Sequence, residues 1–247
     1  MRRRDLLYAV ISLLILWQVG AWIVHRPILP PPWDVARTFV TELGGSLPLH
    51  FLASLRRVLL STLLAILLAA PAGLVLGQSK QLNRLFSPLI YLVYPIPKVV
   101  FVPIVLLFLG IGDAPKIAII FLILFFQILV LVRDQAAALR PELIQSVRSL
   151  GAGRRALFRL VYLPASLPAI LTALRQSVGT AVALLYVAEL YATQEGLGYY
   201  IYLNGSTLFN YPAMYAGIVA MSLLGLGLYF SVDWLEKKLC PWQFAAV

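Results

Sequence analysis

Long apolar runs alternate with short polar or broken segments along this chain. Six runs are long enough to cross a membrane, at about Leu6–Val24, Phe51–Ser79, Phe86–Gly110, Lys116–Val132, Pro168–Tyr191 and Ala213–Leu235. A helix of about 20 apolar residues crosses the hydrocarbon core of a bilayer. The pattern therefore predicts an all-α, polytopic membrane protein with six transmembrane helices.

The third run is the least regular. It contains Pro95, Pro97 and Pro103, with Lys98 near its middle. Proline lacks the backbone donor that a helix interior needs, so it kinks the helix. Carbonyl groups freed by a kink must find partners within the protein or face a water-filled cavity. We therefore expect this span to be broken and turned away from lipid.

The segments between the runs divide the chain into two parts. Residues 1–50 hold the first span and a proline-rich external loop, in which Trp33–Leu43 suits a short interfacial helix. Residues 51–247 hold a five-helix core, with a polar loop at Lys80–Arg84 and a re-entrant or external segment at 196–211. A basic segment at 134–166 is too long for a simple connection, and such loops are usually functional.

Composition favours a membrane protein over a soluble one. Hydrophobic residues make up 61% of the 247 residues and charged residues only 12%, which is about half the charged share of a soluble domain. The formal net charge is +10, and many basic residues cluster in the N-terminal Arg2–Arg4, in six arginines between Arg133 and Arg159, and in Lys237–Lys238. Cytoplasmic loops of membrane proteins are enriched in Lys and Arg. The clustering therefore predicts cytoplasmic termini and a cytoplasmic basic segment, and it argues against a nucleic acid partner.

The local sequence patterns that mark common enzymes are absent. There is no G-x-x-x-x-G-K-[ST] phosphate-binding sequence and no H-E-x-x-H zinc sequence. The two histidines, His25 and His50, flank the external loop, where we expect interfacial residues rather than ligands. The single cysteine, Cys240, cannot form an intrachain disulfide. We expect no enzyme activity, no metal site and no cofactor bound by this chain.

Two spans carry small residues at every fourth position. Small residues at this spacing let helix backbones approach closely, and close packing drives helix association in lipid. We therefore predict tight helix packing along both stripes, although alanine and glycine are also simply common in membrane helices. The stripes are Ser61, Ala65, Ala69, Gly73 and Gly77 in the second span, and Ala165, Ala169, Ala173, Ser177 and Ala181 in the fifth.

Two charged residues lie within predicted spans. Lys98 is deep in the third span, and Glu189 is near the outer end of the fifth. Charges inside a membrane are costly and usually face a cavity or a charged partner. Both are therefore candidates for the translocation pathway. A structural ion pair, or a side chain that snorkels to the headgroups, remains the alternative for each.

The basic segment predicts two short helices joined by a glycine turn. Pro141 and Glu142 suit the first turn of a helix. The side chains Leu143, Val147 and Leu150 give that helix one apolar face. Gly151 suits a left-handed cap at its end, and a second helix is expected from about Arg154 to Tyr162, ending before Pro164. Such a cytoplasmic segment has the character of a docking element.

This segment resembles the signature loop of binding-protein-dependent ABC permeases, the membrane subunits of type I ABC importers. The family pattern is Glu-Ala-Ala, three residues, Gly, nine residues, Ile, one residue and Leu-Pro. The same spacing here joins Gln145-Ser146-Val147, Gly151, Val161 and Leu163-Pro164, with Gln145-Ser146-Val147 departing from Glu-Ala-Ala. The resemblance implies that this segment, with Leu143 and Leu150, sits in a groove of an ATPase as the coupling helix.

The resemblance extends over about residues 50–238 and to a subgroup that includes aliphatic sulfonate, taurine and nitrate permeases. It rests on Pro95-Ile96-Pro97-Lys98, Gly110-Ile111-Gly112, Ala188-Glu189 and Gly196-Leu197-Gly198. It implies two copies of this chain, two copies of a separate ATPase that binds ATP and Mg, and an external substrate-binding protein.

The sequence is compatible with more than one substrate class and more than one class of membrane protein. Subgroup resemblance favours a small organic or inorganic anion as the substrate, but related permeases also carry larger organic solutes such as vitamin precursors. An ion-driven secondary transporter or channel would work without an ATPase and would leave the basic segment without a role. A membrane-embedded enzyme would need a cluster of catalytic residues at one membrane depth, and the sequence shows none.

Overall fold

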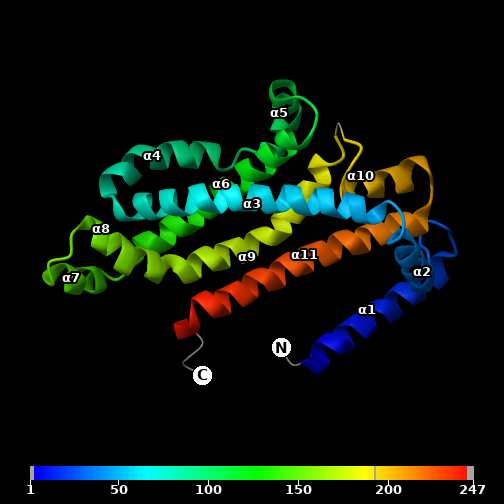
Figure 1. The fold of residues 1–247 in the computed structure, drawn as a ribbon, viewed down its shortest axis with the longest axis horizontal. Coiled ribbons are helices and arrows are strands. Elements are labelled where there is room, and N and C mark those ends of the chain that lie inside the picture. The colour runs from blue at the N-terminus through cyan, green and yellow to red at the C-terminus, as the bar shows by residue number, and fades with distance from the viewer. Residues whose placement is uncertain (1–2, 192, 244–247) are drawn as a thin grey trace. The chain divides into compact units, whose positions relative to one another are not determined.

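The computed structural model describes residues 3–191 and 193–243, and every regular element within these two ranges is a helix (Figure 1). The all-α prediction is therefore confirmed. The longer helices are α1 (Arg3–Val24), α2 (Pro32–Glu42), α3 (Leu47–Gln78), α4 (Lys80–Val93), α6 (Asp113–Ala137), α9 (Leu163–Ala188) and α11 (Tyr211–Leu239). The shorter ones are η1 (Lys98–Phe101), α5 (Val102–Leu109), α7 (Pro141–Ser149), α8 (Arg154–Leu157), η2 (Phe158–Tyr162), α10 (Leu197–Tyr202), η3 (Leu203–Thr207) and η4 (Pro241–Gln243).

Five of the described helical stretches are long and apolar enough to cross a membrane by themselves. They are Leu7–Val24, Leu47–Gln78, Asp113–Ala137, Arg154–Ala188 and Tyr211–Leu239. A sixth span is formed by two pieces, Lys80–Val93 and Lys98–Leu109, which meet at a bend of 77°. The predicted broken third span is this bent pair, and its break lies at the predicted cluster of prolines and Lys98.

Contacts between residues divide the chain into two compact units. The first contains the chain up to Leu55 together with Glu189–Leu224, and the second contains Arg56–Ala188 together with Gly225 to the C-terminus. Helices α3 and α11 each contribute residues to both units. The predicted division at residue 50 into an N-terminal part and a five-helix core stays a prediction.

In the first unit, α1 is held near its end rather than along its length. The Trp17 indole Nε1 donates a hydrogen bond of 3.0 Å to the Pro30 carbonyl, and its ring lies 5.6 Å from that of Tyr215. Only 6% of the apolar stretch of α1 is buried. In α2, by contrast, Val35 is buried, so the short helix predicted after the proline run packs into this unit.

In the second unit, α6 is the central helix. Its side chains Ile120, Leu124, Ile128 and Val132 are fully buried at every fourth position, which is the spacing of a single helix face. Helix α9 packs against α6 along its length. The small residues Ala173 and Ser177 of α9 are buried, whereas Ala169 is half-buried.

The small-residue stripe of α3 lies directly against α6. Ala65 and Ala69 are fully buried. A β-carbon added at Gly73 would lie 2.9 Å from the Leu129 carbonyl oxygen, and one added at Gly77 would lie 2.5 Å from the Arg133 carbonyl oxygen. Real β-carbons do not approach other atoms that closely, so only glycine allows the two backbones this separation.

The expectation of a polar loop at Lys80–Arg84 is wrong. These residues form the first turn of α4, and only Ser79 separates α4 from α3. Ser79 has extended backbone angles, and its hydroxyl accepts a hydrogen bond of 3.3 Å from the Leu82 amide. A serine cap of this kind satisfies one of the free donors at a helix start, so the polar run begins a helix that folds back along α3 (Figure 1).

The expected end of the second loop helix before Pro164 is also wrong, as is a fifth span that begins only after Pro168. Helix α8 passes through the π-helical turn η2 directly into α9, which contains both prolines. The Leu163 amide bonds to the Phe158 carbonyl, five residues earlier. A wider turn of this kind shifts the hydrogen-bond register, and it lets the helix continue past a residue that would otherwise break it.

Candidate functional site

The predicted coupling segment is a short helix with an apolar surface that this chain leaves open. In α7, Leu143 is 44% exposed and Leu150, which caps the helix, is 86% exposed, while Val147 is half-buried. Gln145 and Ser146 are exposed between them. Two exposed leucines among exposed polar and charged residues such as Arg148 are typical of an interaction surface.

A glycine turn ends this helix, as predicted. Gly151 has φ +82°, which lies in the left-handed region that side chains with a β-carbon rarely adopt. Its amide donates a hydrogen bond of 3.0 Å to the Arg148 carbonyl. The chain then reverses into α8 through Gly153, whose φ of −77° is open to any residue.

A basic groove follows the turn. It has a volume of about 820 Å³ and is lined by Gly153, Arg154, Arg155, Ala156, Arg159 and Leu160. Further along the same helix, the signature residues Leu163 and Pro164 are exposed and half-buried, respectively. The exposed leucines of α7 are therefore followed in the chain by a positively charged surface on α8 and η2.

The upstream end of the coupling segment is fixed to neighbouring helices. The Gln78 side-chain amide at the end of α3 donates to the Ala136 carbonyl near the end of α6. The buried Arg133 guanidinium bonds to the Asp134 carboxylate at 2.8 Å and lies 5.3 Å from the centre of the Tyr91 ring of α4. The segment thus begins from the packed ends of α3, α4 and α6.

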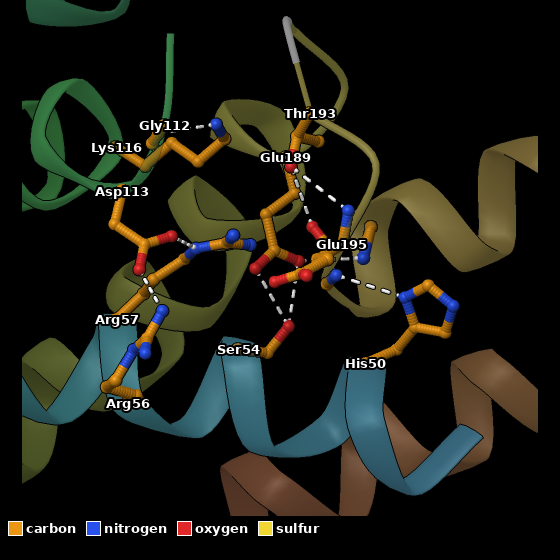
Figure 2. A network of polar contacts seen from close by, with 12 residues as sticks. His50, Ser54, Arg56, Arg57, Gly112, Asp113, Lys116, Glu189, Thr193 and Glu195 are labelled. Atoms are coloured by element: carbon orange, nitrogen blue, oxygen red, sulfur yellow. Dashed lines mark hydrogen bonds and ion pairs between the residues drawn. The ribbon is translucent and has the colours of Figure 1, made fainter. Parts of the chain in front are cut away.

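Glu189 lies at the centre of a buried polar cluster in the first unit (Figure 2). Its carboxylate accepts a hydrogen bond from the Ser54 hydroxyl, which lies 2.8 Å from each oxygen and can donate its single proton to one of them at a time. The carboxylate also accepts a 2.8 Å bond from the Gly198 amide, and the Ser54 oxygen accepts a 2.7 Å bond from the Leu197 amide.

This cluster serves as the cap of α10. Leu197 and Gly198 form the first turn of that helix, and the preceding residue, Gly196, has no side chain to cap it. The first amides of a helix have no partner within it, and a negative charge at that end is favourable. Glu189 and Ser54 provide both the acceptors and the charge from elsewhere in the chain.

His50 extends the same cluster (Figure 2). Its Nδ1 lies 3.1 Å from the Gly196 amide and accepts that hydrogen bond, because a backbone amide can only donate. Its ring packs 5.3 Å from the ring of Tyr200. Burial, and then the Glu42 carboxylate, raise the pKa of the Tyr200 hydroxyl above its ordinary value. His50, which we expected to be an interfacial residue, thus packs against the start of α10.

A second polar cluster belongs to the second unit and gathers at the start of α6. The Asp113 carboxylate accepts hydrogen bonds from Arg56 and from Arg57, the latter at 2.7 Å (Figure 2). Lys116 is buried, and its ammonium donates a 2.7 Å bond to the Gly112 carbonyl. The two arginines are therefore paired with a carboxylate, and the buried lysine is hydrogen-bonded to a backbone carbonyl.

Lys98 has local partners at the break in the bent span. Its side chain is buried, and its ammonium donates to the Val93 carbonyl at 3.0 Å and to the Tyr94 carbonyl at 2.6 Å. It also lies 5.0 Å from the centre of the Phe126 ring. The last carbonyls of a helix lack partners within it, so Lys98 caps α4. Its predicted place beside the translocation pathway stays a prediction.

The family of this chain shows what kind of protein carries these features. A family model described as the binding-protein-dependent transport system inner membrane component matches residues 61–240. This chain belongs to that family. Its members are permease components of transport systems, so the chain is a multi-pass inner-membrane transport component rather than an enzyme. Membership implies ATPase and binding-protein partners and a dimeric arrangement.

Relatives of the permease have different named substrates. The taurine transport system permease protein TauC of Escherichia coli (strain K12) is 30% identical over 240 residues, covering 94% of this chain and 87% of TauC. The formylaminopyrimidine transport permease protein ThiX of Halalkalibacterium halodurans is 29% identical over 234 residues, covering 94% of this chain and 93% of ThiX.

A solved structure shares the fold of the permease. An inward-facing structure of the MetNI methionine ABC transporter aligns with a TM-score of 0.67 at 20% identity, covering 77% of this chain and 94% of that one. The predicted type I ABC importer permease fold is therefore confirmed.

Ser54 and Asp113 of the two polar clusters, and Tyr91 beside Arg133, could not be identified as functional residues from the sequence. None of them gave a signal, because each is an ordinary residue in a span or at its edge. Their roles depend on partners far along the chain, such as the 135 positions that separate Ser54 from Glu189. Only the pairing of Glu189 with the Gly196-Leu197-Gly198 sequence could have suggested that the acid caps the following helix.

Proposed function

We propose that this chain is the permease subunit of an ABC importer for a small organic anion of the sulfonate class, such as taurine. It works as a homodimer with two ATPase subunits and an external substrate-binding protein. The dimer forms a pathway that opens alternately to the two sides of the membrane. ATP and Mg bind to the ATPase, and this chain performs no covalent chemistry.

The main support for a role of this chain in coupling to the ATPase is the structure of α7 and the turn that follows it. Its two exposed leucines and the left-handed turn at Gly151 form a compact apolar surface next to a basic groove. Such a surface suits a hydrophobic cleft with an acidic rim on the ATPase. Movement of the ATPase would reach the membrane through α6 on one side and through the continuous helix Arg154–Ala188 on the other.

The topology that fits this role has both termini in the cytoplasm. Lys237 and Lys238 close the last span, and six arginines lie between Arg133 and Arg159. Arg2, also part of the predicted cytoplasmic N-terminus, lies outside the described residues. Excess Lys and Arg mark the cytoplasmic side, so the loop with α2 would be external.

The likeness to TauC supports a sulfonate, and the likeness to ThiX supports a second candidate. The two relatives differ by only one percentage point in identity to this chain, at 30% and 29%. A pyrimidine vitamin precursor is therefore the alternative substrate of the same importer class.

Uptake into proteoliposomes tests this function. The permease is reconstituted with its ATPase, and the binding protein is added outside with taurine, an alkanesulfonate, nitrate or formylaminopyrimidine. We expect ATP-dependent accumulation of a sulfonate and none of formylaminopyrimidine. Accumulation of formylaminopyrimidine alone would favour the alternative substrate, and accumulation driven by an ion gradient without the ATPase would reject the importer class.

A further inference from the structure

Two tyrosines stand at the end of α4, directly before the break in the bent span. Tyr91 is the third-last residue of α4 and Tyr94 caps it. Residues three apart on a helix lie on the same side. Their side chains are open to the surface of this chain, with 66% of Tyr91 and 46% of Tyr94 exposed.

A buried cation lies against each ring. The Arg133 guanidinium of α6 lies 5.3 Å from the centre of the Tyr91 ring, and the Lys98 ammonium lies 5.4 Å from the centre of the Tyr94 ring. Both cations are more than nine-tenths buried. A positive charge beside a phenol ring polarises the ring and its O–H bond, so each hydroxyl becomes a stronger hydrogen-bond donor to an anion.

The hydrogen bonds around these groups leave a donor for a ligand. The Arg133 guanidinium donates to the Tyr91 hydroxyl oxygen at 3.5 Å. Since that oxygen is the acceptor in this bond, the Tyr91 proton is still available to donate. Lys98 is buried and donates two of its three ammonium hydrogens to the Val93 and Tyr94 carbonyls. We therefore assign its effect on a ligand to the positive charge behind the Tyr94 ring.

The position in a broken span favours water over lipid in front of the tyrosines. Irregular backbone at membrane depth is tolerated where it is buried in protein or lines a water-filled cavity. The backbone between Val93 and Lys98 is irregular, with Pro95 and Pro97 inside it. Two exposed tyrosines at such a place suit a water-filled pathway.

We propose that Tyr91 and Tyr94 form an anion-recognition element of the pathway. Their hydroxyls donate to the oxygens of a sulfonate-type anion while Arg133 and Lys98 supply positive charge from behind the rings. This inference rests on the proposed function, because it assumes that the transported solute is an anion. The other occupant of such a surface is lipid, with the tyrosines as interfacial anchors.

The hydroxyl groups are tested by Tyr91→Phe and Tyr94→Phe in the reconstituted complex with taurine. Each change removes one oxygen and keeps the ring. We expect the KM for taurine uptake to rise about tenfold per hydroxyl, as for a lost hydrogen bond to a charged group. Tyr229→Phe on α11, where the side chain is 42% exposed and packs on Phe230, is the matched control and leaves KM unchanged.

The cation behind Tyr94 is tested by a double-mutant cycle with Lys98→Met. If the ammonium acts through the hydroxyl, adding Tyr94→Phe to Lys98→Met raises the KM for taurine far less than tenfold. Wild-type KM in both tyrosine variants would place them against lipid and overturn the inference. A wild-type complex that carries formylaminopyrimidine but no sulfonate would instead reject the proposed substrate, and the inference with it.

Discussion

At the scale of single residues, two glycines after α7 differ in what they require. Gly151 has φ +82°, whereas Gly153 has φ −77°, and a β-carbon at either position would meet no atom within 4 Å. Space is therefore equal at the two sites, and only the backbone conformation differs. A residue with a β-carbon costs about 1–2 kcal/mol in the left-handed conformation.

We predict that Gly151→Ala and Gly151→Val impair coupling while Gly153→Ala does not. The strained residue would re-aim α8 relative to the leucines of α7, but a cost of about 1–2 kcal/mol is too small to unfold a membrane helical protein of this size. The measurement is taurine uptake per ATP hydrolysed in the reconstituted complex. Equal ratios for Gly151→Val and wild type would show that this turn does not set the docking geometry.

The left-handed turn was predictable from sequence, and the partner of Glu189 was not. Gly151 stands at the end of an apolar periodicity, where glycine has one common use. Glu189 stood out as a charge in a span, but its use depends on Ser54, which folding brings to it from 135 positions away. A single sequence carries no signal for such a pair.

At the scale of helices, the approach of α3 to α6 is set by two glycines. The contacts at Gly77 are tighter than those at Gly73, since an added β-carbon would lie 2.5 Å from backbone oxygen rather than 2.9 Å. In α9, Gly179 has open space around the same position. The three sites thus form a graded series within membrane helices.

Gly77→Ala should destabilise the permease more than Gly73→Ala, and Gly179→Ala should be neutral or slightly stabilising. Forced separation of packed helices costs about 1–3 kcal/mol, whereas alanine in open helix positions gains up to about 1 kcal/mol over glycine. Thermal unfolding of the detergent-purified protein gives the order. A Gly77→Ala variant as stable as Gly179→Ala would mean that α3 and α6 do not pack this closely.

The helices themselves were largely predictable, and their ends were not. Apolar runs of the right length marked each span, because a backbone that crosses lipid must satisfy its own hydrogen bonds and therefore forms a helix. The errors at Lys80–Arg84 and Pro164 come from local hydrogen bonds, namely the Ser79 cap and the π-turn at Phe158–Tyr162. The sequence alone does not show whether a polar run or a proline ends a helix or lies within one.

For the chain as a whole, the proposed topology places two exposed residues on opposite sides of the membrane. Ala36 in α2 and Ser149 in α7 are both exposed. A cysteine at position 36 should react with an impermeant maleimide added to intact cells, and one at position 149 should react only after the membrane is opened. The opposite pattern would invert the topology.

The native thiol does not disturb this labelling. Cys240 is fully buried, and burial, followed by the charge of Glu236, raises the pKa of its thiol. Since only the thiolate reacts with a maleimide, wild-type protein is the unlabelled control.

Site-specific cross-linking tests whether α7 docks on an ATPase subunit. Leu150 after α7 and Leu107 in α5 are both 86% exposed, so they form a matched pair. Each is replaced by cysteine in a Cys240→Ala background, labelled with a benzophenone maleimide and illuminated in the assembled complex. We predict a covalent adduct with the ATPase subunit from position 150 and none from position 107. An adduct from position 107 alone, or from neither position, would show that α7 does not dock on the ATPase.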